Sequence, residues 1–143
     1  EAEGSRPIAV IFNLGVNDMA NASNYVSYMT NIAPTLKKKN CKLFYMSVNP
    51  INSTMITKAG RGARTEAQVR EFNSKIHSGL SVYYKFIDTY SVLMKKGYGT
   101  NASYVGVDRD SDDGLHYTTK TYKRIYYYCV TYLNTGSINA TYY

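Results

Sequence analysis

The sequence contains no tryptophan, only two histidines and two cysteines, and no apolar run long enough to cross a bilayer. Without such a run we expect no membrane-spanning helix. The two histidines are far apart and no cluster of metal-ligating side chains surrounds them, which argues against a metal enzyme. A glycine-rich loop of the kind that cradles phosphates is also missing, so no cofactor is expected.

What is present indicates one globular domain. The chain has 143 residues, of which 44% are hydrophobic and 19% are charged, and these proportions are ordinary for a folded domain. We expect residues 1–7 to be a linker or processing remnant, residues 8–135 to form the domain and residues 136–143 to be a C-terminal tail. No signal-peptide pattern opens the sequence, so any export signal is expected to have been removed already.

The positive charge of the chain has two interpretations. The formal net charge is +7, and basic residues gather at 37–39, 95–96 and 120–124. Two of these groups follow expected helices, where cations interact favourably with the helix dipole. No recognised nucleic-acid-binding module accompanies them, so we interpret them as solvated faces and expect no nucleic-acid partner. The alternative is a basic nucleic-acid-binding module, which predicts lysines clustered on one face and strongly salt-dependent binding.

Tyrosine, cysteine and asparagine leave further alternatives open. Most of the sixteen tyrosines fall at positions where packing is expected, although tyrosines can also line a sugar-binding surface. Cys41 and Cys129 can form a disulfide or remain two buried thiols. Asn-x-Ser/Thr sequons matter only in a eukaryotic secretory pathway. They start at Asn21, Asn52, Asn101 and Asn139.

The first half of the chain predicts two strands joined by a helix. Residues 8–12 are five apolar residues rich in β-branched types, which predict a strand buried on both faces. Apolar residues then recur at helical spacing from 25 to 36, where Pro34 should kink or restart the helix. Asn40 is expected to end this helix in the left-handed conformation. A second strand is expected over residues 42–48, before Asn49-Pro50.

The second half continues the alternation. The loop that follows Asn49-Pro50 and continues through residues 60–62 is expected to be long and flexible. Thr65 then begins a helix with a capping box, and the apolar face of this helix is Val69, Phe72 and Ile76. A third strand is expected over 82–87 and a short helix over 88–96. A polar loop follows over 98–112, and Thr118 caps a last helix with Tyr122, Ile125, Cys129 and Leu133 facing inward. Strands alternating with helices predict an α/β fold with a parallel sheet and right-handed crossovers.

An Asp three residues before a His stands just ahead of the last helix. Asp113 can reach the His116 imidazole because Gly114 lets the backbone turn between them, and such a carboxylate fixes the tautomer of the ring. A histidine held in this way can take a proton from a serine hydroxyl and return it to a leaving alcohol. The other histidine, His77, lies at a helix end and is expected to be a surface residue.

A polar turn follows the first strand. Gly15-Val16-Asn17-Asp18 comes where open α/β sheets bind ligands, at the carboxyl end of a strand. The Asn17 amide can donate a hydrogen bond to a developing oxyanion, and Asp18 can hold the turn or cap the next helix.

The order of these features resembles the SGNH (GDSL-like) hydrolases. An apolar strand, Gly-x-Asn-Asp, two strand-helix units and Asp-x-x-His before the terminal helix are similar to the third and fifth conserved blocks of that family. The resemblance extends to Asn13-Leu14, to Ser47-Val48-Asn49-Pro50 and to Leu115 and Tyr117. It covers residues 8–133 and implies a flavodoxin-like three-layer α/β/α fold whose first strands are missing here.

The resemblance also implies residue roles. His116 would be the general base and then the acid, Asp113 would orient it, and Asn17 would be an oxyanion-hole donor. Gly15 would permit the turn, and Ser47 and Asn49 would line the substrate pocket. Asp112, beside the pair, is given no catalytic role.

The chain departs from the family pattern before the first strand. The family's nucleophilic serine and a second oxyanion-donor glycine lie in blocks that precede Gly-x-Asn-Asp, and neither block is present here. Gly4-Ser5-Arg6 lacks the Asp and the preceding strand, so Ser5 is a poor nucleophile candidate, and Ser47 is another. The missing portion would pair with the strand at 8–12. We therefore expect a complementary N-terminal chain, or a second copy of this one, against that strand.

Three function classes follow. The first is a serine-type ester hydrolase of the SGNH kind, secreted by a bacterium, acting on acyl esters or O-acetyl carbohydrates; this chain supplies base and oxyanion donor but not the nucleophile. The second is a non-catalytic relative that binds glycan or protein through its Tyr-rich surface. The third is the nucleic-acid-binding module described above.

Overall fold

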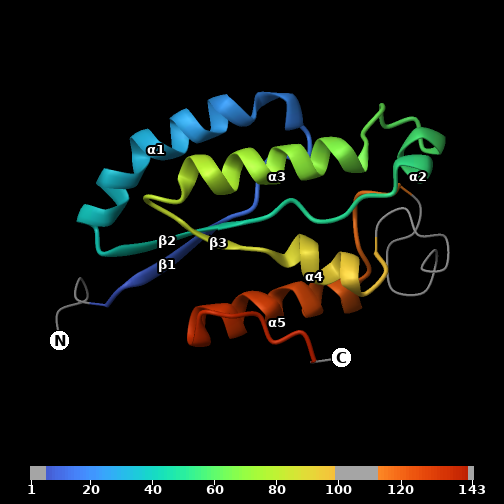
Figure 1. The fold of residues 1–143 in the computed structure, drawn as a ribbon. Coiled ribbons are helices and arrows are strands. Elements are labelled where there is room, and N and C mark those ends of the chain that lie inside the picture. The colour runs from blue at the N-terminus through green and yellow to red at the C-terminus, as the bar shows by residue number, and fades with distance from the viewer. Residues whose placement is uncertain (1–5, 99–112, 142–143) are drawn as a thin grey trace. The chain divides into compact units, whose positions relative to one another are not determined.

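The computed structural model describes residues 6–98 and 113–141, which form two compact units. The first unit comprises residues 6–48 and 71–87, and the second comprises 49–70, 88–98 and 113–141. Figure 1 labels the α-helices and the strands. In chain order the elements are β1 (Ile8–Phe12), the short 3-10 helix η1 (Met19–Asn21), α1 (Ala22–Lys38), β2 (Cys41–Met46), α2 (Ser53–Lys58), α3 (Glu66–Leu80), β3 (Lys85–Ile87), α4 (Thr89–Lys95) and α5 (Thr119–Thr135).

The strands of the first unit form a small parallel sheet in the order β1-β2-β3. Ile8 pairs with Cys41 and Phe12 with Tyr45, while Met46 pairs with Ile87 on the other side of β2. Each step along the sheet passes through a helix, and two crossovers of one hand in the same direction bring both helices to one face. Figure 1 shows α1 and α3 side by side along the sheet. The expected α/β class with a parallel sheet is therefore confirmed.

A glycine lets the two helices of the first unit approach closely. A Cβ built on Gly79 of α3 would lie 2.7 Å from both methyl carbons of Val26 in α1. Real Cβ atoms do not approach so closely, so a larger residue at 79 would push α1 away or force Val26 to move. The central strand β2 supplies the core of the unit, since Leu43, Phe44, Tyr45 and Met46 are all buried.

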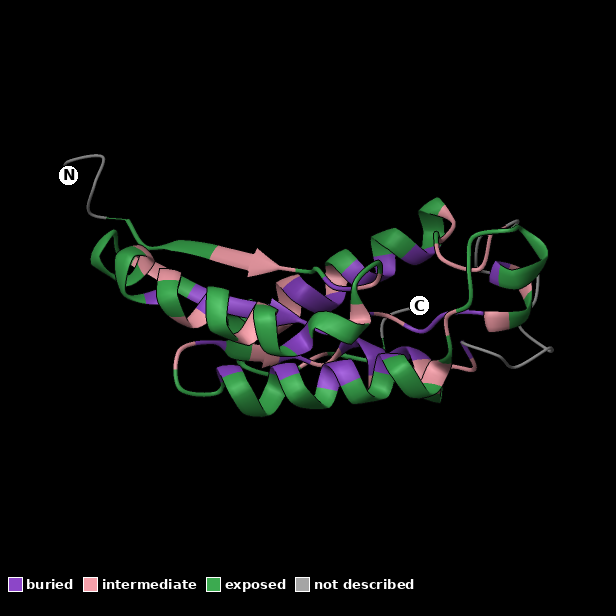
Figure 2. Ribbon diagram, turned by 90° about the horizontal axis from the view of Figure 1, so that it is seen from above, coloured by how far each residue is buried: buried purple, intermediate pink, exposed green. Residues whose placement is uncertain are grey.

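The expectation that the first strand is buried on both faces is wrong. Ile8 is 58% exposed and Val10, Ile11 and Phe12 are only half-buried, as the green and pink colouring of β1 in Figure 2 shows. The reason is that β1 has a neighbour on one side alone: it pairs with β2, and no other described residue pairs with its second edge. Such an open, uncharged edge can accept another strand.

Several predicted element boundaries are confirmed by their hydrogen bonds. Thr65 and Gln68 form the reciprocal capping box, with the Thr65 hydroxyl accepting from the Gln68 N–H and the Gln68 side chain accepting from the Thr65 N–H. Asp88 and Thr118 cap α4 and α5 by accepting the N–H of Ser91 and Thr121. Asn40 has a positive φ of 58°, as a left-handed stop requires. Pro34 lies inside α1, which continues past it to Lys38.

Three local predictions need correction. The loop before residue 60 contains α2, because Asn52 accepts the N–H of Met55 and caps a helix that apolar periodicity does not reveal. The third strand begins at Lys85 rather than 82, because the N–H groups of Tyr83 and Tyr84 both bond to the Leu80 carbonyl and prolong the helical turn. On α5 the predicted Tyr122 and Leu133 are 47% and 37% exposed, whereas the polar Thr121 and Arg124 are buried.

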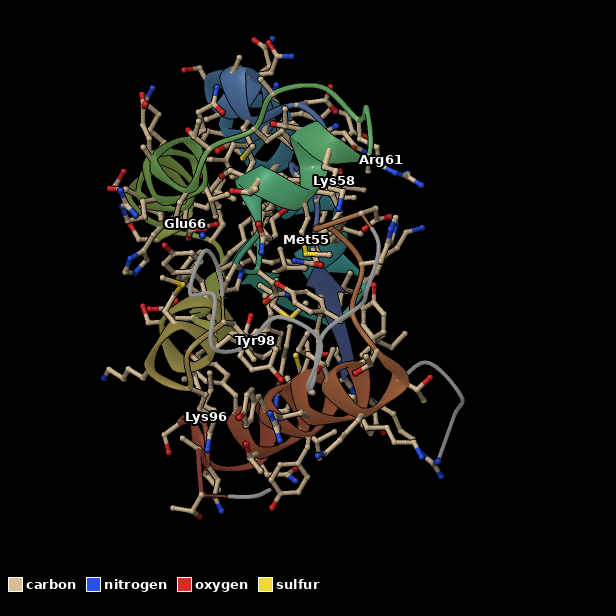
Figure 3. All side chains as sticks on the ribbon, turned by 90° about the vertical axis from the view of Figure 1, so that its right-hand side faces the viewer. Met55, Lys58, Arg61, Glu66, Lys96 and Tyr98 are labelled. Atoms are coloured by element: carbon tan, nitrogen blue, oxygen red, sulfur yellow. The ribbon has the colours of Figure 1, made fainter. Side chains whose placement is uncertain are left out.

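The buried polar face of α5 explains that last correction. Arg124 donates to the Tyr98 hydroxyl at 2.8 Å, and the same hydroxyl lies 2.8 Å from the Thr121 hydroxyl. Figure 3 shows Tyr98 beside α5. These hydrogen bonds lower the cost of burying the polar groups, and the buried face of the helix turns towards them.

No helix in the described part of the chain combines the length and apolar character that a membrane crossing needs.

A candidate histidine–aspartate pair and the turn after the first strand

The second unit brings Asp113 and His116 into direct contact. Asp113 Oδ2 accepts a hydrogen bond from His116 Nδ1, and Asp113 Oδ1 accepts the backbone N–H of Leu115 at 2.8 Å and of His116 at 3.0 Å. The Asp113 side chain is 14% exposed, whereas the His116 side chain is 63% exposed. With Nδ1 occupied by the carboxylate, Nε2 of a neutral ring is left as the proton acceptor. The geometry is that of a base held by its orienting carboxylate.

The segment that carries the pair is fixed to the loop before α2. Gly114 has a φ of +73°, and a Cβ there would lie 2.5 Å from the backbone oxygen of Asn52, so only glycine fits. The Gly114 carbonyl accepts the N–H of Asn52 at 3.0 Å, and the Tyr117 hydroxyl donates to the Pro50 carbonyl. These bonds on both sides of the pair keep the backbone turn in one conformation.

The surroundings of Asp113 favour its charged form. Partial burial by itself raises the pKa of the carboxyl, but the backbone N–H groups of His116 and Leu115 and the His116 ring outweigh burial and lower the pKa to about 2. The guanidinium of Arg61 lies 3.5 Å from Asp113 Oδ2, and Figure 3 shows Arg61 just beyond α2. Asp113 is therefore a carboxylate over the whole physiological range, as a residue that stabilises an imidazolium must be.

In the first unit, Gly15, Asn17 and Asp18 form a tight turn after β1. The Asp18 N–H bonds to the Gly15 carbonyl at 3.0 Å, which places Val16 and Asn17 at the tip. Gly15 is buried with a φ of +115°, and a Cβ there would lie 2.1 Å from Phe72 Cζ. Asn17 is exposed. Asp18 holds the turn and accepts the Tyr25 hydroxyl at 3.1 Å, and its side chain makes no capping bond to η1.

An apolar groove lies beside this turn in the same unit. Its volume is about 260 Å³, and its lining comes from Leu14, which directly precedes Gly15, and from the first turns of α1. The lining residues are Leu14, Asn24, Tyr25, Tyr28 and Met29. Leu14 is 47% exposed and Tyr28 is 62% exposed, so the groove opens to solvent.

The two residues predicted to line a pocket after β2 belong to different units. Ser47, in the first unit, has no exposed surface, and its carbonyl accepts the Asn13 side-chain amide at 2.9 Å. Asn49, in the second unit, is half-buried and its side-chain oxygen accepts the Thr89 hydroxyl at 2.7 Å. Their role towards a substrate stays a prediction.

The predicted site residues thus fall into two groups. Gly15, Asn17 and Ser47 lie in the first unit, and Asn49, Asp113 and His116 lie in the second. The approach of Asn17 to His116 that the family resemblance implies is a relation between the units and stays a prediction. Ser5, Asp112 and the sequon at Asn101 lie outside the described residues.

Sequence reasoning missed two residues that shape these groups. Arg61 reaches Asp113 from 52 positions earlier in the chain, and no pattern connects them. Asn73 of α3 is buried and bonds both backbone groups of Val48, accepting its N–H at 2.8 Å and donating to its carbonyl at 2.9 Å. A lone Asn on the apolar face of a predicted helix is the signal that could have identified the second, since buried amides need partners.

Other expectations concern metals, cysteines and glycosylation. Within residues 6–98 and 113–141, no group of three or more His, Cys, Asp or Glu side chains could hold a metal ion. Cys41 and Cys129 form no disulfide; Cys129 is buried, as expected for a thiol, and Cys41 is half-exposed. Asn52 is 5% exposed and its side-chain oxygen caps α2, so this sequon is inaccessible in the folded unit.

Comparison with known proteins adds no family assignment: no family model matches the sequence, and no curated protein matches it with significance.

Proposed function

We propose that this chain supplies the general base and an oxyanion donor of a serine-type ester hydrolase of the SGNH kind. The observation that carries the proposal is the pair itself: His116 Nδ1 is hydrogen-bonded to Asp113, and the His116 side chain is 63% exposed. The contact adds little to the stability of the fold, since exposed ion pairs contribute little. An oriented and accessible imidazole is what proton transfer requires.

The chemistry would proceed in two acyl-transfer steps. As a serine Oγ attacks the ester carbonyl, His116 Nε2 takes the hydroxyl proton, and Asp113 stabilises the imidazolium that forms. The negative charge that develops on the carbonyl oxygen would accept a hydrogen bond from the Asn17 amide. The tetrahedral intermediate then expels the alcohol, which takes the proton from His116. Water repeats the sequence on the acyl-serine and releases the acid.

The apolar groove beside the Asn17 turn supports an acyl substrate. Leu14 and Tyr28 offer exposed apolar surface close to the residue that would hold the oxyanion, and the acyl group would lie in the groove of about 260 Å³. Acetyl or other short acyl esters, including O-acetyl carbohydrates, are the substrates proposed. The three-layer SGNH arrangement, secretion and a bacterial source belong to the same proposal.

The nucleophile would come from outside residues 1–143. We propose that the polypeptide which carries it, a complementary N-terminal segment or a second copy, pairs with the open edge of β1. The uncharged strand Ile8–Phe12 supports this proposal, because unpaired backbone groups along an apolar edge favour strand addition.

A fluorophosphonate label tests the proposal, with the two histidines as a matched pair. The protein, together with any polypeptide that accompanies it, is treated with the probe and the adduct is located by mass spectrometry. We expect a labelled serine outside this chain, strong loss of labelling and of acetyl-ester turnover in His116→Gln, and unchanged values in His77→Gln. His77 is exposed and stacks on Phe86 at a centroid distance of 4.5 Å, and the proposal gives it no part in the reaction.

Two results would overturn the proposal. One is an absence of labelling and turnover in every preparation, and the other is an equal rate for His116→Gln and the unsubstituted protein. A label on Ser5 or Ser47 would instead refute the statement that the nucleophile lies elsewhere.

A second candidate function is a non-catalytic SGNH-like relative that binds glycan or protein through tyrosines. The observation in its favour is that Tyr122 and Tyr126 of α5 are 47% and 71% exposed and lie one helical turn apart, on one face. Exposed tyrosines on one face form a stacking surface for sugar rings or a partner protein. Glycan binding that survives His116→Gln and is lost in Tyr122→Ala and Tyr126→Ala would favour this function.

A further inference from the structure

A second hollow lies in the first unit, at the amino-terminal ends of β2 and β3. Its volume is about 420 Å³, and three lysines from three different elements line it: Lys37 from the last turn of α1, Lys42 from β2 and Lys85 from β3. The polar turn at Gly15–Asp18 follows the opposite, carboxyl end of β1 in the same parallel sheet. This hollow is therefore separate from the candidate catalytic residues.

The charge in the hollow is strongly positive. No Asp or Glu is among its lining residues, and no carboxylate in the described part of the chain pairs with the three lysines. The carboxyl end of α1 carries the negative pole of the helix dipole, worth about half an elementary charge. This pole accounts for the presence of Lys37 in the last turn of α1, but it does not account for Lys42 or Lys85, which lie on strands. Three positive charges outweigh that pole, so the hollow attracts anions.

The walls of the hollow are apolar and aromatic. Leu43 and Phe44 are buried and Tyr83 is half-buried, and the Lys37 ammonium lies 5.2 Å from the centroid of the Tyr83 ring. A cation over an aromatic face is attracted by the ring, so Tyr83 helps to hold Lys37 at the hollow. A ligand with an anionic group and a planar or apolar body can use both the lysines and the Tyr83 ring.

The number of lysines indicates which anion is suited best. A carboxylate brings one negative charge, whereas a phosphomonoester carries about 1.5 to 2 at neutral pH and has three strong acceptor oxygens. Lysine binds phosphate as a point charge, so three lysines favour the anion that carries the greater charge. The hollow has the size of a small-molecule site, since such sites span roughly 300–1,000 Å³.

We propose that this hollow binds a small-molecule phosphomonoester. The phosphate group lies among the ammonium groups of Lys37, Lys42 and Lys85, and the organic part of the ligand lies against Tyr83 and Phe44. The proposal does not depend on the ester-hydrolase function, because it uses none of the same residues.

Calorimetric titration of the full chain with three probes tests the site. Inorganic phosphate alone reports the anion contribution, glucose 6-phosphate adds a sugar body and AMP adds a planar base. We expect the organic phosphates to bind at least about tenfold more tightly than inorganic phosphate, a difference of about 1.4 kcal/mol. Tighter binding of AMP than of glucose 6-phosphate identifies a nucleotide as the source of the phosphate, and the reverse order identifies a sugar.

Two triple variants of equal charge separate a site from general attraction. The first variant removes the three lysines of the hollow: Lys37→Ala/Lys42→Ala/Lys85→Ala. The second removes three exposed lysines of the second unit: Lys58→Ala/Lys95→Ala/Lys123→Ala. Each variant lowers the net charge from +7 to +4. We expect the first to weaken binding at least about tenfold and the second less than about twofold. Circular dichroism checks the fold, and the single variant Lys85→Ala replaces the first triple if that triple unfolds.

Equal weakening in the two triples, or no saturable binding of any of the three phosphates to the unsubstituted protein, would overturn the proposal.

Discussion

Replacing Asp113 by Asn isolates the charge of the carboxylate from its hydrogen bonds. Asn keeps an oxygen that can accept the N–H groups of Leu115 and His116, which lie 2.8 and 3.0 Å from Asp113 Oδ1. It removes the negative charge that faces the His116 ring and the Arg61 guanidinium, 3.5 Å away. The variant should therefore fold with the same turn and lose the electrostatic part of the stability.

The magnitude follows from the pKa of Asp113. Folding lowers the pKa from 3.8 to about 2. At 1.36 kcal/mol per pKa unit the full shift corresponds to about 2.4 kcal/mol, but the Asn oxygen retains part of the hydrogen bonding and the partners are exposed to solvent, so we expect about 1 kcal/mol. The side chains of Arg61 and His116 are 52% and 63% exposed, which is the reason for that reduction.

The direction with pH is fixed by the sign of the shift. A carboxyl whose pKa is lower in the folded state stabilises that state fully above its unfolded pKa, and the stabilisation disappears as the pH falls through the folded pKa. The difference between the two proteins should therefore be present at pH 5 and should shrink between about pH 4 and pH 2. Urea denaturation followed by far-ultraviolet circular dichroism, at a series of pH values in this window, measures it.

Glu71→Gln is the matched control for Asp113→Asn. The hydrogen bond from Lys75 lowers the pKa of Glu71 as well, but both side chains are more than half exposed, so removing this charge should change the stability much less. A difference for Asp113→Asn that persists unchanged to pH 2, or that grows as the pH falls, would refute the reasoning.

Two further predictions concern the first turn and the cysteines. Gly15→Ala should destabilise the protein by about 2–4 kcal/mol in thermal or urea unfolding, because a Cβ at this positive φ would meet the Phe72 ring. Gly60→Ala is the control. Gly60 has a φ of +67° and no atom within 4 Å of an added Cβ, so this substitution should cost only about 1 kcal/mol. Equal losses would contradict this. In a thiol assay with Ellman's reagent, Cys41 should react in the native protein while Cys129, 8% exposed and with a pKa that burial raises to about 11, should react only on unfolding. Equal native rates would contradict the burial of Cys129.

Local features of this chain could be predicted from sequence because their partners lie within a few residues. The capping box at Thr65, the caps at Asp88 and Thr118 and the contact of Asp113 with His116 all close within three positions. Backbone geometry alone brings such residues together, whatever the rest of the fold does. The sequence pattern therefore carries most of the information on these contacts.

Features set by distant partners could not be predicted in this way. The apolar residues of β1 indicate a buried strand, but their burial depends on what pairs with the second edge of β1, and the described sheet offers β2 alone. The prediction that Tyr122 and Leu133 of α5 face inward is wrong for a related reason. Arg124 is buried because the Tyr98 hydroxyl, 26 positions earlier, accepts its hydrogen bond, and hydrophobic periodicity does not register such a pair.

The contact of Asp113 with His116 has two explanations that differ in what they require of the ring. If the pair only stabilised the turn, the gain would come from the lowered pKa of Asp113, and His116 would contribute little, because an exposed ion pair is worth at most about 1 kcal/mol. The bond from the Asn52 N–H to the Gly114 carbonyl and the bond from the Tyr117 hydroxyl to the Pro50 carbonyl already fix that turn. The turn thus does not need a histidine, whereas a general base needs an imidazole that is both oriented and reachable. The proposed function therefore predicts that a His116→Gln protein unfolds like the unsubstituted one and loses acyl transfer.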